Sequence, residues 1–251
     1  MMRLLFALTV VVFPAVFAYD GSVAAKTRAL RTGDVSGTAF LLGPFPEQGT
    51  YLQLHTTGDT HPNDWKGARD AEFVGLADVV VSAIPVHNPS AANPSDPPSF
   101  PETGALVCEG TKCEYVTVAT GNRLELYNYG DEAVSLNVVK DGRIRLDISI
   151  DASQTDPPAL VDISSLETGV YEIIDPPSKK LRGWLYRAAA GEIVVGPTGG
   201  NCRYTIALTP GKYRIRAWHP HFSPIEQIVK IRAGIITRVN PVFSMKNLQH
   251  P

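Results

Sequence analysis

The residues of this 251-residue chain best suited to metal chemistry are its histidines. His219 and His221 are separated by one proline, and neutral imidazoles at such short spacing can bind Cu(II), Ni(II) or Zn(II). His55 and His61 enclose a polar segment that contains Asp59, which gives a second set of nitrogen and oxygen ligands. The sequence therefore predicts two candidate metal sites, His219/His221 and His55/His61.

A structural role is the alternative for the pair near the C-terminus. A Pro-Gly turn precedes a segment in which apolar and basic side chains alternate, a period typical of a β-strand with one packed face. The apolar set is Tyr213, Ile215 and Ala217, and the basic set is Lys212, Arg214 and Arg216. His219 has the parity of the apolar set, so we expect it on the packed side.

The sequence offers little support for catalysis. It contains no Gly-x-Ser-x-Gly elbow, His-Glu-x-x-His motif, phosphate-binding loop or dinucleotide fingerprint. Its acidic pairs, such as Asp131-Glu132, fall in predicted turns, where carboxylates are usually solvated. Four aromatic residues could line a carbohydrate- or partner-binding face, namely Trp184, Tyr186, Trp218 and Phe222, although aromatics of β-sandwiches usually belong to the core. We predict that the protein is not an enzyme and interpret Trp184 as a core residue.

The three cysteines indicate a local disulfide. Cys108 and Cys113 are separated by a short polar segment that contains a glycine, which suits a tight loop. Cys202 then remains, either buried as a free thiol or paired with one of the other two. A zinc site would need four ligands, and no matching second pair exists in the sequence. We therefore predict a Cys108–Cys113 disulfide.

The N-terminus is typical of a secretory signal peptide. Arg3 precedes an apolar run over 4–13, Pro14 follows it, and Val16-Phe17-Ala18 offers small residues for cleavage. The run is shorter than the roughly 20 residues that span a bilayer. We expect a mature chain that begins near Tyr19, has no membrane span and is periplasmic or secreted. A formal net charge of −2 without a basic cluster argues against nucleic acid as a partner.

The rest of the chain alternates like a β protein and shows no convincing helical periodicity of ten or more residues. Asp141-Gly142 is its strongest hairpin signal. We divide the chain into a signal peptide (1–18), an N-terminal β segment (19–84), a Pro-rich loop (85–105), a core (106–187), a C-terminal module (188–245) and a tail (246–251). The fold class predicted from this pattern is all-β, built from β-sandwiches.

Several motifs resemble a bacterial periplasmic family called methylamine-utilisation-like or plastocyanin-like. They are Val35-Ser36-Gly37, Leu76-Ala77-Asp78-Val79-Val80-Val81, and the segment from Pro210-Gly211 to Trp218-His219. The resemblance implies a cupredoxin-like sandwich over 106–187, followed by a transthyretin-like (carboxypeptidase-regulatory-like) module over 188–245. A strand ending in Trp-His-Pro is itself a feature of that module, which favours a structural role for His219.

The copper ligands that the resemblance implies are missing. The family places a histidine just after the turn at 128–131, and a cysteine with a histidine near the end of the core. Here 128–136 contains no histidine, and 175–184 contains neither residue type. We expect a degenerate core without a cofactor, in a non-enzymatic protein that supports or docks a protein partner of a periplasmic or envelope redox system. The alternative is a protein that binds copper or another metal through His219/His221 or His55/His61.

Overall fold

A computed structural model describes residues 32–43, 73–86, 103–109, 112–244, 246 and 248–249. The described residues form β-strands joined by turns and loops and contain no α-helix. The prediction of an all-β fold is therefore confirmed. The predicted signal peptide, His55 and His61 lie outside the described residues.

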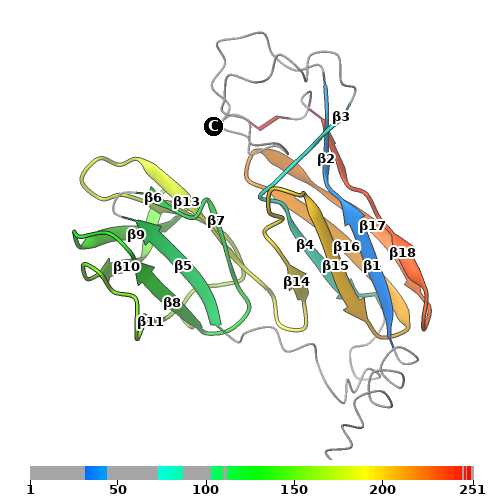
Figure 1. Cartoon of the computed structure of the whole chain (residues 1–251), viewed down its shortest axis with the longest axis horizontal. Coiled ribbons are helices and arrows are strands. Elements are labelled where there is room, and N and C mark those ends of the chain that lie inside the picture. The colour runs from blue at the N-terminus through cyan, green and yellow to red at the C-terminus, as the bar shows by residue number, and fades with distance from the viewer. Residues whose placement is uncertain are drawn as a thin grey trace, which may run out of the picture.

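The first structural unit combines strands from both ends of the chain (Figure 1). Its strands are β1 (Gly33–Thr38), β2 (Phe40–Leu42), β3 (Phe73–Gly75), β4 (Val80–Pro85), β14 (Ile193–Val195), β15 (Arg203–Leu208), β16 (Gly211–His219), β17 (Phe222–Ile231), β18 (Ile236–Arg238) and β19 (Val242–Ser244). One sheet has the order β15-β1-β18 and the other β14-β4-β16-β17, while β19-β2-β3 form a small third sheet. We call this unit the first sandwich.

The second structural unit is formed entirely by the middle of the chain. Its strands are β5 (Thr103–Glu109), β6 (Lys112–Cys113), β7 (Val116–Ala119), β8 (Arg123–Asn128), β9 (Val134–Lys140), β10 (Arg143–Ile150), β11 (Ala159–Asp162), β12 (Gly169–Ile174) and β13 (Leu181–Arg187). They form one sheet of order β10-β9-β12-β13-β7 and another of order β11-β8-β5-β6. We call this unit the inserted sandwich, because the chain leaves the first sandwich after β4 and returns to it with β14.

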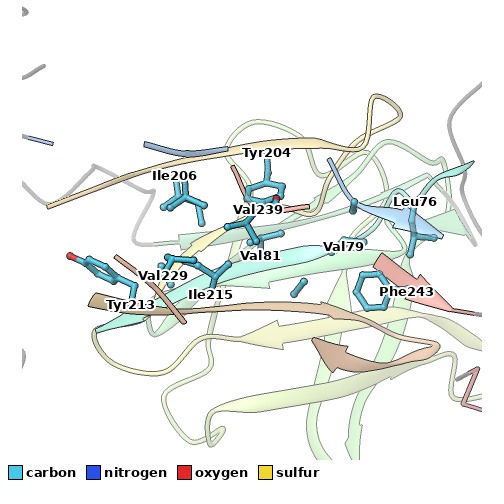
Figure 2. Packing of buried hydrophobic residues seen from close by; sticks show 14 of the residues in the cluster. Leu76, Val79, Val81, Tyr204, Ile206, Tyr213, Ile215, Val229, Val239 and Phe243 are labelled. Atoms are coloured by element: carbon cyan, nitrogen blue, oxygen red, sulfur yellow. The ribbon is translucent and has the colours of Figure 1, made fainter. Parts of the chain in front are cut away.

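Apolar residues of alternating parity fill the first sandwich (Figure 2). Val79, just before β4, and Val81, within β4, both pack with Ile215 of β16. Tyr204 and Ile206 of β15 face them from the other sheet. A separate apolar cluster, which includes Leu126, Val138, Ile150 and Ile173, fills the inserted sandwich. Each unit therefore has its own core.

The two ends of the chain are tied together by strand pairing. β1 pairs with β15 in antiparallel order and with β18 in parallel order, and β4 pairs with β16. The segments 19–84 and 188–245, which were predicted as separate units, thus share three sheets and one core. Pro85 ends β4, β5 begins at Thr103 within the segment assigned to the Pro-rich loop, and 87–102 lies outside the described residues.

Local turn chemistry accounts for the hairpin between β9 and β10. Arg143 pairs with Lys140, so Asp141 and Gly142 form a two-residue loop. Both residues have positive φ, 53° and 70°, as a type I′ turn requires. An aspartate followed by glycine tolerates this conformation, and the predicted hairpin is confirmed.

The cysteines behave as the sequence predicts. Cys108 and Cys113 lie directly opposite each other on β5 and β6 and form a disulfide. Cys202 is buried, follows the turn at Gly199–Gly200 and takes no part in a disulfide. Of the two possibilities left open for Cys202, the structure therefore has the buried thiol outside any disulfide.

A candidate functional site at the joint between the sandwiches

The most chemically varied cluster of side chains lies where the two sandwiches meet. The outer face of the β14-β4-β16-β17 sheet packs there against β13 and the neighbouring β7. This joint is centred on a third apolar cluster, whose buried members are Val80, Val116, Tyr186, Ala188, Val194 and Trp218. Tyr115, Val118, Val170 and Trp184 pack around it and are partly buried.

Trp218 contributes the largest buried side chain of the joint. It has the parity of Arg214 and Arg216, on the face of β16 that alternation predicts to be wet, yet only 7% of its surface is exposed. Its ring lies 6.4 Å from that of Trp184 in an edge-on arrangement and 5.5 Å from that of Tyr186. These separations are within the range of favourable aromatic pairs. The inserted sandwich therefore covers part of a face that would otherwise be solvated.

His219 points into the first sandwich, as its parity predicts. It is 1% exposed, and its ring lies 5.2 Å from that of Phe222 and 6.2 Å from that of Phe243. The backbone N–H of His221 donates to its Nδ1 at 3.2 Å. In the neutral imidazole this acceptor role places the ring proton on Nε2. The ring thus fixes the turn between β16 and β17.

His221 connects the two sandwiches by a hydrogen bond. It lies in the turn after β16, and its Nε2 is 2.6 Å from the hydroxyl oxygen of Tyr115, which precedes β7. The two rings are nearly stacked, with 27° between their planes. Burial lowers the pKa of His221 below its usual value and, as the largest cause, raises the pKa of Tyr115. Both groups are therefore held in their neutral forms near neutral pH.

A second hydroxyl secures the return of the chain to the first sandwich. Tyr186 donates to Glu192 Oε1 at 2.8 Å, and Glu192 Oε2 accepts the backbone N–H of Ala189 at 2.9 Å. Burial first, and then the Glu192 carboxylate, raise the pKa of Tyr186 to about 12. The phenol therefore remains a hydrogen-bond donor throughout the ordinary pH range, and it fastens the segment between β13 and β14.

The titration of His221 predicts a pH dependence of stability. Because its pKa in the folded protein is lowered, the unfolded chain binds a proton more readily below about pH 6.5. The neutral ring therefore contributes to the free energy of unfolding above that pH, and this contribution is lost as the pH falls toward the pKa of His221 in the folded protein. We expect His221→Gln to cost less stability at about pH 5.5 than at about pH 7.5. Urea unfolding of both proteins at both pH values measures this, and an equal cost at the two would contradict it.

The structure brings one of the two predicted histidine pairs together. The rings of His219 and His221 are 5.6 Å apart. In the described ranges, no group of three or more His, Cys, Asp or Glu residues is placed to hold a metal ion. The second pair, His55 and His61, lies outside those ranges.

In the two turns where the resemblance would place copper ligands, polar side chains form other hydrogen bonds. The buried Asn128 side chain donates to the carbonyls of Glu132 and Asp151 at 2.7 and 3.0 Å and accepts the N–H of Gly130 at 3.0 Å. At the second turn, Asp175 accepts hydrogen bonds from Ser178 and from Arg182, the latter at 3.0 Å. The Ser178 hydrogen bond is the main cause that lowers the pKa of Asp175. Each turn is thus stabilised by its own side chains.

Sequence reasoning placed Tyr115 and Glu192 at the beginning of predicted strands and assigned neither a site role, because their hydrogen-bond partners are contributed by other segments of the chain. It also placed Trp184 in a core, whereas this side chain is partly buried at the joint. The signal that was available is Trp218, a large aromatic on the polar face of a strand. Such a residue indicates that another element covers that face.

The fold and the joint define this chain as a two-sandwich all-β protein with an internal disulfide. A comparison with family models, curated proteins and solved structures found no match to it. The part of the chain that the structure describes contains no helix long and apolar enough to cross a bilayer.

Proposed function

We propose that this chain is an exported, non-enzymatic structural protein that supports or docks a protein partner of a periplasmic or envelope redox system. The support comes from the joint. Two sandwiches with separate cores are connected by a largely apolar contact of aromatic side chains. Such a contact favours one fixed arrangement of the units, which is what a support for another protein needs.

One observation carries this proposal over a metal-binding role. The ring nitrogen His221 Nε2 is engaged by Tyr115 across the joint, and His219 Nδ1 by the turn that carries His221. Chelation through either nitrogen would have to break one of these hydrogen bonds. The two imidazoles thus already have structural partners: His221 bonds across the joint, and His219 holds the turn that carries His221.

A second candidate function is binding of copper or another metal. The proximity of the His219 and His221 rings favours it, because two imidazoles at this separation need little movement to share an ion. In that case the metal would compete with Tyr115 for His221. The pair His55/His61 remains a further candidate for the same role.

A copper titration of the mature protein from Tyr19, followed by EPR and mass-resolved metal analysis, distinguishes the two functions. The structural proposal predicts no tight, stoichiometric copper. Tight binding that disappears in His219→Ala or His221→Ala would replace the structural proposal with that of a metal carrier. Binding that survives in both variants and disappears in His55→Ala would assign the metal to the other pair. The wild-type protein with zinc in place of copper serves as the spectroscopically silent control.

A further inference from the structure

The edge strand β17 presents an open segment of backbone. It is the last strand of the β14-β4-β16-β17 sheet, and β16 is its neighbour on the inner side. On the outer side, the described residues of the C-terminal tail lie against the beginning of β17. Leu248 bridges to Phe222, and the N–H of Gln249 donates to the carbonyl of His221 at 2.7 Å. Among the described residues, no strand pairs with the outer edge of β17 beyond this bridge.

The open segment of β17 combines one exposed apolar side chain with two charged ones. Ile228, at its centre, is 52% exposed. Glu226 and Lys230 lie two residues to either side of it, on the same outward face. Toward the interior, Ile225 and Gln227 line a shallow groove whose other wall is 239–242. The edge is therefore apolar at its centre, with opposite charges at equal distances on either side.

This arrangement is complementary to itself. In an antiparallel pair of identical strands related by a two-fold axis at Ile228, each Glu226 lies opposite Lys230 of the other strand. Ile228 then faces Ile228, and their exposed apolar surface is covered. Charges on an edge strand usually oppose pairing with a second strand. Here, however, the antiparallel register joins two opposite-charge pairs, which stabilises a β ladder.

Within one copy, Lys230 faces another positive charge across the sheet. Its cross-strand partner on β16 is Lys212, and like charges directly opposite each other destabilise a sheet. Glu226 lies near Arg214 and Arg216, at 3.7 and 3.9 Å, and so is held on the outward face. A second copy would bring this carboxylate beside Lys230 and offset the Lys212–Lys230 repulsion.

We propose that β17 is a homodimerisation edge, and that a second copy of this chain adds its own β17 in antiparallel register about Ile228. The pairing joins two four-stranded sheets into one of eight strands. β17 begins next to the joint, directly after His221, whereas Figure 1 shows its later part farther from the inserted sandwich, toward β18. Because the inference rests on this edge and not on the joint, it is independent of the proposed function.

Charge reversal provides the test. Sedimentation velocity of the mature chain, with its disulfide intact, is expected to show a concentration-dependent dimer. Lys230→Glu places two like-charge pairs in the interface and is expected to raise the dimer dissociation constant at least about tenfold. Glu226→Lys is expected to do the same. An equimolar mixture of the two variants restores both opposite-charge pairs and is expected to recover the dimer.

The mixture separates the proposal from a simple loss of folding. If Glu226→Lys unfolds, Ile228→Lys, which places two lysines at the two-fold axis, takes its place as the dissociating variant. Ile144→Lys is the matched control, because Ile144 is 57% exposed on β10 of the inserted sandwich. A monomeric wild-type protein at every concentration would overturn the proposal. So would unchanged dimers in the charge variants, equal dissociation by Ile144→Lys, or a mixture that stays monomeric.

Discussion

Replacing Trp218 with alanine is expected to lower the free energy of unfolding by about 3–5 kcal/mol, the usual cost of removing a buried tryptophan. The side chain is 7% exposed and packs on Trp184 and Tyr186 of the inserted sandwich. Neither sandwich has this ring in its own core. The substitution therefore weakens the contact between the two sandwiches and leaves each core complete.

Calorimetry distinguishes this loss from a general weakening. We expect the wild-type protein to unfold in one cooperative transition, and Trp218→Ala to unfold in two, as the sandwiches separate. Tyr129→Ala is the control, because this aromatic belongs to the inserted sandwich but is 59% exposed. A single transition of unchanged midpoint in Trp218→Ala would show that the ring does not hold the units together.

Adding one methyl group at Gly37 is expected to cost at least about 3 kcal/mol, the upper end for an overpacked site. A Cβ at this position of β1 would lie 1.7 Å from the carbonyl oxygen of Val239. That backbone cannot easily retreat. The N–H of Val239 donates to the carbonyl of Ser36 at 3.0 Å, and the carbonyl of Val239 accepts a hydrogen bond from the hydroxyl of Tyr204. Gly37→Ala should therefore disturb the close contact of the N-terminal strand with the C-terminal strands.

The measurement is urea unfolding of Gly37→Ala beside Gly200→Ala. Gly200 lies in a turn where an added Cβ would meet nothing within 4 Å, so its substitution is expected to be nearly neutral. Equal stability of the two variants would mean that β1 does not pack against Val239 as described.

Most strands could be predicted because alternation is a local property of the sequence. Asp141-Gly142 fixed a hairpin by turn chemistry, and Tyr213, Ile215 and Ala217 marked a packed face that the structure also has. The partners of those strands could not be predicted in this way. Alternation indicates that a face is buried but not which segment covers it. The pairing of β1 with β15 and β18 joins residues about 165 to 200 positions apart, and no local pattern encodes it.

In the candidate site, too, the features that depend on local sequence could be predicted, and those that depend on contacts between distant segments could not. The burial of His219 followed from its parity, and the Cys108–Cys113 disulfide followed from spacing. The Tyr115–His221 hydrogen bond did not, since it depends on how the inserted sandwich sits against the first one. In the sequence, that contact was indicated by Trp218, a large aromatic residue on the polar face of a strand. The structure identifies the strands that cover it.

If His221 holds the two sandwiches together through Tyr115, a double-mutant cycle at these two positions will show that the side chains are coupled. Urea unfolding of Tyr115→Phe, His221→Ala and the double variant, at a pH where His221 is neutral, gives the coupling free energy between the two side chains. We predict a coupling of about 1 kcal/mol, as for a partly buried hydrogen bond. A coupling indistinguishable from zero would mean that the Tyr115–His221 hydrogen bond does not hold the joint, and it would leave His221 available for a metal.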